Sequence, residues 1–471
     1  MSFYDFSFND DNIEPNGFHI EEEISACRNL IDSNLIYESI ERIEDVILLC
    51  VENSYLNDGL FFVNYLLGIS AYNSELWSKK GMLLNLSDDY EEAIECFDKA
   101  LSLNPGDAEI LIDKSTVEEN LGHYLKAEET LKSVLSTDPN NEEALYNLGI
   151  LNQRKEDFRI AKHYFIRVLK IDPDFAEAYY ELGYCDENLN MYEQALNMYD
   201  KFLELDPYNA NGWYNRGIVL SKQNKFEQSL NSYDLAVSLK DNFSSAWFNK
   251  GNVLSELGRS TEAMESFKTA YQIDKFDEST CFNIANLYEE KGDMINAIKY
   301  FTKAIKVNDQ FYEAFLARGY CFDSTCKYHL ALKDFNRAIS LSSDKEEAWY
   351  AKADLEYSLG KLQESVNSYL AALKISPDNH QLWFSLAETY FEIGNWLDAI
   401  NAYDKCININ PQDARSFYGK AKVSFLLRQT QEAIGCLKKA FAIDPEIKQK
   451  FTKDYPEIKT SKLFKKLLDE N

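Results

Sequence analysis

Seven of the nine prolines in this chain fall on a single repeating interval, a period of 34. Four follow one another at that interval, three more do so near the C-terminus, and five such intervals separate the two groups. The prolines are Pro105, Pro139, Pro173, Pro207, Pro377, Pro411 and Pro445. A fixed period of this length indicates a chain of stacked supersecondary units, each of which packs mainly on its neighbours.

Placing these prolines at position 32 divides Ser74–Ile447 into eleven repeats without an insertion. Positions 8 and 20 hold only Gly, Ala or Ser, whereas position 24 is always Phe, Tyr or Leu. The apolar positions 4, 7, 8 and 11, and then 20, 24 and 27, have helical spacing and predict two helices in each repeat. Small residues on facing helices allow a close antiparallel approach, and the large residue at position 24 fills the space beside them.

This pattern resembles the tetratricopeptide repeat (TPR) family, and the resemblance covers about four fifths of the chain. It implies an all-α fold, a right-handed α-solenoid superhelix of antiparallel helix hairpins. In that family the first helix of each hairpin lines a concave groove. Proline at position 32 is expected to end the second helix, because it disfavours helical geometry in the residue before it. Repeats 5 to 8 lack it, so we expect their second helices to end less sharply.

The segments outside the eleven repeats (74–447) are less regular. We predict a disordered acidic N-terminus over 1–19 and an N-terminal helix followed by one degenerate repeat over 20–73. A C-terminal capping helix or tail is predicted over 448–471, since the last unit of a solenoid needs a polar outer face. The helices expected in these segments are Ile20–Asp32, Ile43–Asn53, Gly59–Ser70 and Thr460–Asp469.

Charge limits the partners, because 49 basic and 78 acidic residues leave a net charge of −29. A surface this negative repels phosphate backbones and anionic membranes and favours basic partners. We therefore expect a protein or peptide partner, with a basic one favoured, and no nucleic acid. The alternative is that the acidity only keeps the protein dissolved.

The same sequence favours a cytoplasmic location. Its nine cysteines form no Cys-x-x-Cys pair, which suggests a reducing compartment. The opening stretch Met1–Gly17 has neither a basic nor an apolar signal region. No apolar run approaches the ~18 residues of a membrane span, so no membrane insertion is expected.

We find no motif that predicts chemistry. The five histidines have no metal-ligand spacing, and the phosphate-binding and nucleophile motifs are missing from the sequence. We therefore predict that the chain is not an enzyme, with no catalytic, metal or cofactor-binding residues and no cofactor.

The family geometry implies that positions 2, 5, 6, 9, 12 and 13 face the groove. Position 5 is aromatic in eight repeats and position 6 is Asn in four. Because an amide both donates and accepts hydrogen bonds, a row of Asn can pair with an extended peptide backbone. The row is similar to the asparagine ladder of O-linked N-acetylglucosamine transferases, although Glu181 interrupts it. The candidate groove residues are Tyr146, Asn147, Tyr180, Tyr214, Asn215, Phe248, Asn249, Asn252, Phe282, Asn283 and Asn286.

The resulting hypothesis is an interaction scaffold or adaptor that binds extended peptide or protein partners in its groove. The alternative for the groove residues is that they are family consensus without a dedicated role. Position 2 is acidic in six repeats, which suits either a basic ligand or the positive end of the helix dipole. A self-assembling structural protein and a regulatory subunit of a separate enzyme stay open as alternative functions, and so does the oligomeric state.

Overall fold

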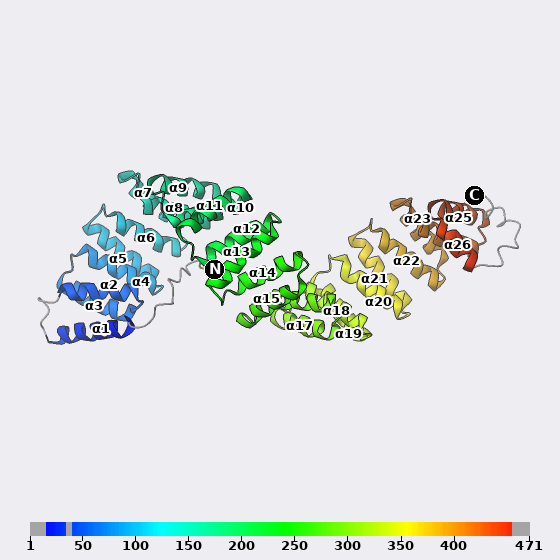
Figure 1. Cartoon of the computed structure of the whole chain (residues 1–471), viewed down its shortest axis with the longest axis horizontal. Helices are drawn as coiled ribbons and strands as arrows, with labels where there is room; N and C mark the ends of the chain where they lie inside the picture. Colours follow the sequence, from blue (N-terminus) through cyan, green and yellow to red (C-terminus); the bar gives the residue numbers. More distant parts are fainter. Residues whose placement is uncertain (1–15, 34–39, 455–471) are drawn as a thin grey trace. The chain divides into compact units, whose positions relative to one another are not determined.

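The computed structural model describes residues 16–33 and 40–454. All the regular elements within those residues are helices (Figure 1). The chain divides into two compact parts, which we call the N-terminal half, Met1–Asp241, and the C-terminal half, Asn242–Asn471. Each half is described by itself.

The N-terminal half contains thirteen of the described helices. They are α1 (Asn16–Asp32), α2 (Ile40–Glu52), α3 (Leu56–Ile69), α4 (Ser74–Leu86), α5 (Tyr90–Leu103), α6 (Ala108–Asn120), α7 (Tyr124–Thr137), α8 (Glu142–Arg154), α9 (Phe158–Ile171), α10 (Ala176–Asn188), α11 (Tyr192–Leu205), α12 (Ala210–Lys222) and α13 (Phe226–Leu239).

The C-terminal half contains the other thirteen described helices. They are α14 (Ser244–Glu256), α15 (Ser260–Ile273), α16 (Glu278–Glu290), α17 (Met294–Val307), α18 (Tyr312–Ser324), α19 (Tyr328–Leu341), α20 (Glu346–Ser358), α21 (Leu362–Ile375), α22 (His380–Ile393), α23 (Trp396–Ile409), α24 (Ala414–Leu426), α25 (Thr430–Ile443) and α26 (Pro445–Asp454).

The helices follow the period of the sequence. From α4 onward each even-numbered helix up to α24 begins one full period after the previous one, at position 1 of a repeat. Within each half, every helix packs on the next one along the chain. The predicted all-α solenoid of helix hairpins is therefore confirmed.

Close contact between the two helices of a hairpin depends on small side chains. Ala161 at position 20 is fully buried, as are its counterparts in neighbouring repeats. Gly149 at position 8 lies against the ring of Phe165 at position 24, so closely that a Cβ atom there would come within 2.4 Å of it. The volume of the ring replaces the missing side chain, as the sequence pattern predicts.

Consecutive repeats are also joined by recurring polar contacts. A cation at position 7 pairs with an acid at position 25 of the preceding repeat, with N–O distances of 2.7 Å for Lys114–Asp98, Arg216–Asp200 and Lys420–Asp404. The indole N–H of Trp213 at position 4 donates to the carbonyl of Pro207 at position 32 of the preceding repeat, at 2.9 Å. These contacts orient each hairpin on its neighbour.

We expected the second helices without proline at position 32 to end less sharply. For the position at which these helices end, this expectation is wrong. Helices α13, α15, α17 and α19 lack the proline, yet they end at position 30, as the proline-bearing helices do. In two of them an Asx turn follows the helix, since Asp274 Oδ1 accepts from the Phe276 N–H at 2.8 Å and Asn308 Oδ1 from the Gln310 N–H at 3.0 Å. The same turn follows proline-bearing helices at Asp138 and Asp172.

The ends of the described chain are helical. Helix α1 begins before the predicted Ile20, at Asn16, and α2 and α3 cover the two stretches expected in the degenerate repeat. After α25, Pro445 starts α26, where its fixed φ suits the first turn of a helix. The predicted helix Thr460–Asp469 and residues 1–15 of the predicted disordered segment lie outside the described residues.

Candidate protein-binding surface

The five candidate aromatic residues at position 5, Tyr146, Tyr180, Tyr214, Phe248 and Phe282, are half-buried. Each packs its ring against the position-24 ring of its own repeat, with the second helix bringing the two together. The centroid distances are 5.6 Å for Tyr146–Phe165, 5.9 Å for Tyr180–Tyr199, 6.0 Å for Tyr214–Tyr233, 5.7 Å for Phe248–Phe267 and 5.5 Å for Phe282–Phe301. These rings therefore support the hairpin, and only their remaining exposed area can meet a partner.

Three of the candidate asparagines take part in hydrogen bonds between adjacent first helices. Asn215 Nδ2 of α12 donates to the hydroxyl of Tyr180 on α10, at 2.8 Å. Asn283 Nδ2 of α16 donates to Asn252 Oδ1 on α14, also at 2.8 Å. Asn215 and Asn283 each donate one hydrogen bond to the neighbouring repeat. A side-chain amide has a second N–H and a carbonyl oxygen, which can bond to a ligand.

The other candidate asparagines are Asn147 on α8, Asn249 on α14 and Asn286 on α16, all half-buried. Position 6 thus presents amides in both halves, but in the N-terminal half carboxyl groups replace the amide in alternate repeats. Asp113 on α6 and Glu181 on α10 take position 6 on either side of Asn147. The repeat pattern of the sequence did not indicate a role for Asp113.

Asp113 is half-buried, and its Oδ2 atom is enclosed without a hydrogen-bond partner in the described structure. Burial raises the pKa of Asp113 to about 7, and the nearby carboxylates of Glu109 and Glu143 add to the shift. Desolvation also raises the pKa of Glu143, again with a contribution from Glu109. A cation at this point would compensate carboxyl charges that form no ion pair with the described residues.

Glu181, two repeats further along, also has a pKa that is raised by burial. Burial raises its pKa to about 7, against a smaller opposing effect from a hydrogen bond with Gln153. We call Glu109, Asp113, Glu143 and Glu181 the acidic row. Its members come from α6, α8 and α10, which are consecutive first helices of the N-terminal half.

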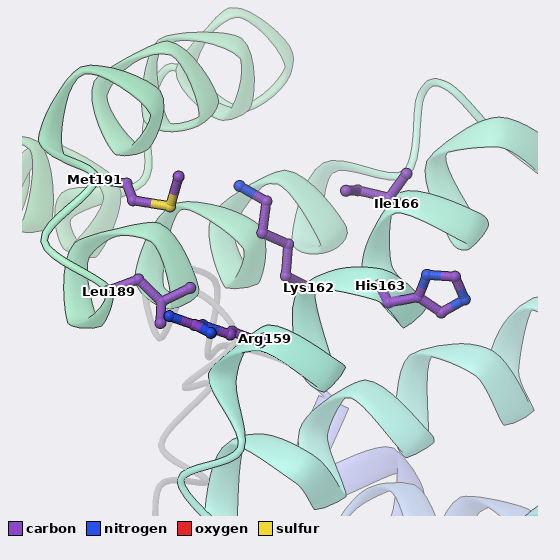
Figure 2. Close-up of a pocket in the computed structure, with 6 residues that line it drawn as sticks. All are labelled: Arg159, Lys162, His163, Ile166, Leu189 and Met191. Atoms are coloured by element: carbon purple, nitrogen blue, oxygen red, sulfur yellow. The ribbon is translucent and has the colours of Figure 1, made fainter.

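A second feature of the N-terminal half lies on α9, a second helix. A hollow of about 610 Å³ is lined there by Arg159, Lys162, His163, Ile166, Leu189 and Met191 (Figure 2). The hollow was not predicted from the sequence. The available signal was the composition of 158–171, which contains four Lys or Arg residues and no acid.

The cysteines are free, and all but Cys326 are buried. Burial raises the pKa of the Cys321 and Cys406 thiols to about 12, so they pack as small apolar residues and are poor nucleophiles. Among the described residues no three His, Cys, Asp or Glu side chains group as metal ligands. Nor is any helix within 16–33 or 40–454 long and apolar enough to cross a bilayer.

Comparison with known families agrees with the repeat pattern. Family models described as tetratricopeptide repeat match residues 74–107, 146–210, 198–231, 244–277, 278–311 and 380–413. A model described as TPR repeat matches residues 353–394. Together these matches cover more than half of the chain.

Among curated proteins there is no significant match. Solved structures that match include MamA, with 25% identity and a TM-score of 0.34 over 34% of this chain and 95% of that chain. The pilF protein of Pseudomonas aeruginosa matches with 20% identity and a TM-score of 0.41 over 45% and 97%. The APC/C assembly of Cut9 and Hcn1 matches with 15% identity and a TM-score of 0.37 over 90% and 95%. On its sequence period, its helix hairpins and the family models, this chain belongs to the tetratricopeptide repeat family.

Proposed function

We propose that this protein is an interaction scaffold whose N-terminal half holds a basic, extended segment of a partner protein along the acidic row. The row lies on first helices, the elements that line the groove in this family. The family membership supports a protein partner, and the uncompensated carboxyl groups support a basic one.

The observation that carries the proposal is the state of Asp113. An enclosed carboxylate oxygen without a hydrogen-bond donor is costly, since a buried polar group left unsatisfied costs on the order of 1–3 kcal/mol. Glu109 and Glu143 add repulsion at the same point. A Lys or Arg side chain of a partner, bound beside these carboxyl groups, would offset the repulsion and favour their ionised form.

Asn147 lies at position 6 between Asp113 and Glu181, one repeat from each. In this proposal its amide pairs with the partner's backbone while the flanking carboxylates pair with side chains. A segment bound in this way is extended, because successive contacts come from successive repeats.

The first experiment measures binding of a short fluorescein-labelled peptide in which Lys alternates with Ala. The double variant Asp113→Asn/Glu181→Gln should bind at least ~30-fold more weakly, since removing one partner of a desolvated charge pair typically costs about 2 kcal/mol or more. The control Glu92→Gln/Glu129→Gln removes the same charge from exposed positions on α5 and α7 and should bind as wild type does. Equal losses in both variants would mean that bulk charge alone attracts the peptide.

The pH dependence gives a second readout. A bound cation favours the ionised carboxyl, so binding lowers the pKa of Asp113 and Glu181 from about 7 and releases protons. Affinity of the wild type should therefore rise between pH 6 and pH 8. The double variant should have a flat profile there, and a flat wild-type profile would contradict the role of these two groups.

The candidate asparagines are tested separately. The test replaces three amides by Ala: Asn215, Asn249 and Asn283. Comparing the crosslinked partners of this variant with those of the wild-type chain shows whether the amides bind ligands. Lost crosslinks would extend the binding surface beyond the acidic row to these amides, whereas an unchanged set would assign them to contacts between repeats.

A further inference from the structure

Helix α9 has a charge opposite to that of the molecule. It carries Arg159, Lys162, Arg167 and Lys170 and no acid, in a chain with a net charge of −29. Among the second helices, α17 is also free of acids, with three lysines. On α17, however, Lys303 lies over the rings of Tyr271 and Tyr300 at 4.4 and 4.3 Å, which uses its charge internally.

On α9 the basic side chains surround a hollow. In Figure 2, Arg159 and Lys162 extend from α9 toward the side where Leu189 and Met191 lie. Leu189 directly follows α10, and Met191 lies in the turn before α11. Lys162 Nζ is paired with the buried carboxylate of Asp186 and also donates to Gln194 Oε1, at 3.2 Å. These two contacts fix one cation at the wall of the hollow.

Arg159 and His163 differ from Lys162, because both are exposed and neither has an ion-pair partner among the described residues. They provide the charge that the hollow offers to a ligand: Arg159 at any physiological pH, and His163 when protonated. The half-buried Ile166 and Leu189 and the exposed Met191 supply apolar surface beside them. The site thus combines cations and apolar area within one depression.

The depression continues past Met191. A second hollow of about 290 Å³ shares this residue and is lined by Asn190, Met191, Tyr192, Glu193, Gln194 and Gln223. Amide side chains dominate its polar lining, and amides suit a peptide backbone because they donate and accept. The two hollows adjoin at Met191, and we call the pair the outer channel.

We propose that the outer channel docks an acidic segment of a partner protein. One carboxylate of the segment pairs with Arg159, and a neighbouring apolar side chain rests on Ile166, Leu189 and Met191. The apolar surface suits a side chain of a peptide better than a phosphate or a nucleic acid backbone, and the net charge of −29 repels a long polyanion. The site is independent of the acidic row and selects the opposite charge.

The test uses the full chain at low salt and pH 7 with a short fluorescein-labelled peptide in which Asp and Glu alternate with Leu and Phe. Arg159→Glu should weaken binding at least ~10-fold, because it replaces an attraction with a repulsion. Ile166→Ser should weaken it several-fold by removing apolar contact. Lys299→Glu makes the same charge change at an exposed position of α17 and should leave affinity unchanged.

Circular dichroism of each variant should match wild type, since Arg159 and Lys299 are exposed and Ile166 is half-buried. Failure of the wild type to bind the peptide would overturn the proposal, and so would equal losses for Arg159→Glu and Lys299→Glu. Equal affinity for a peptide in which Gly replaces Leu and Phe, or displacement by inorganic phosphate at low millimolar concentration, would overturn it too, by reducing the channel to a simple anion site. The variant Asp113→Asn/Glu181→Gln should bind this peptide as wild type does, which separates this site from the proposed groove function.

Discussion

At the scale of single residues, the repeat depends on a contact between position 8 and the ring at position 24. A Cβ atom on Gly149 would lie 2.4 Å from Phe165, and one on Gly183 would lie 2.9 Å from Tyr199. The sequence pattern alone predicted this pair, because both positions keep their size in every repeat. Where Ala replaces Gly at position 8, as in Ala353, the side chain is fully buried.

We expect Gly149→Ala to destabilise the N-terminal half. Overpacking of a well-packed core costs about 1–3 kcal/mol, which exceeds the gain of about 1 kcal/mol in helix propensity. Gly68→Ala is the matched control. Gly68 lies in α3 of the same half, and a Cβ added there would have no atom within 4 Å. The urea midpoint followed by far-UV circular dichroism should fall for Gly149→Ala and hold or rise for Gly68→Ala. A rise in both variants would show that the ring moves aside without cost.

Residues at positions 5 and 6 show where sequence reasoning stops. The pattern could not distinguish a ligand-binding row from a packing row, because each position-5 ring meets a partner at position 24, on the other helix of the hairpin. The structure shows that Tyr146 packs on Phe165 and that Asn215 bonds to Tyr180. These contacts depend on hairpin closure and on stacking of repeats, which no local pattern contains.

At the scale of elements, every described first helix from α2 to α24 is followed by a residue with positive φ at position 15. Five of the residues there are glycine and seven are not. They are Ser54, Asp88, Gly122, Glu156, Asn190, Asn224, Gly258, Gly292, Cys326, Gly360, Gly394 and Arg428. The left-handed conformation reverses the chain direction before the second helix. The hairpin adopts it even where the residue has a side chain, for which this conformation is sterically unfavourable.

Glu156 and Gly122 offer a reciprocal test of this turn. Glu156 has φ 60°, and Glu156→Gly should stabilise the protein, because a side chain in this region costs roughly 1–2 kcal/mol. Gly122→Ala should destabilise it by about 1 kcal/mol, although no atom lies within 4 Å of the added Cβ, since φ is 75°. Urea midpoints that shift in opposite directions would confirm that backbone conformation governs position 15. Shifts in the same direction would contradict it.

At the scale of the whole molecule, the net charge of −29 is distributed unevenly. The acidic row lies on first helices of the N-terminal half, whereas the cations of α9 lie on a second helix of the same half. Two surfaces of opposite charge allow a scaffold to hold two partners of different chemistry. Both attractions should weaken as salt concentration rises.

The buried carboxyls also link stability to pH. The folded pKa of Asp113 is raised to about 7, above the unfolded value of about 3.9, so the folded state binds more protons between those values. Stability therefore falls as pH rises from about 4 to about 7. Asp113→Asn should stabilise the protein at pH 8 by on the order of 1 kcal/mol, the cost of a buried group left unsatisfied, and by much less at pH 4.5. The difference between urea midpoints at the two pH values measures this effect, and a gain independent of pH would contradict it.

The sequence by itself determined the repeat, its two helices and the close contact between them. These follow from a period and from residue sizes, which act over distances shorter than one repeat. The sequence also implied the stop of the second helix, but it pointed to proline, whereas α13, α15, α17 and α19 end at the same position without it.

Only the tertiary structure decided which polar groups lose water and which remain available. Asp113 and Glu181 reach a pKa of about 7 because neighbouring repeats enclose them, and Asn215 is engaged because Tyr180 lies on the adjacent first helix. The outer channel likewise exists only where α9 meets the turn at Met191. Desolvation and charge pairing depend on atoms contributed by other repeats, so the position of a residue within its own repeat cannot reveal them.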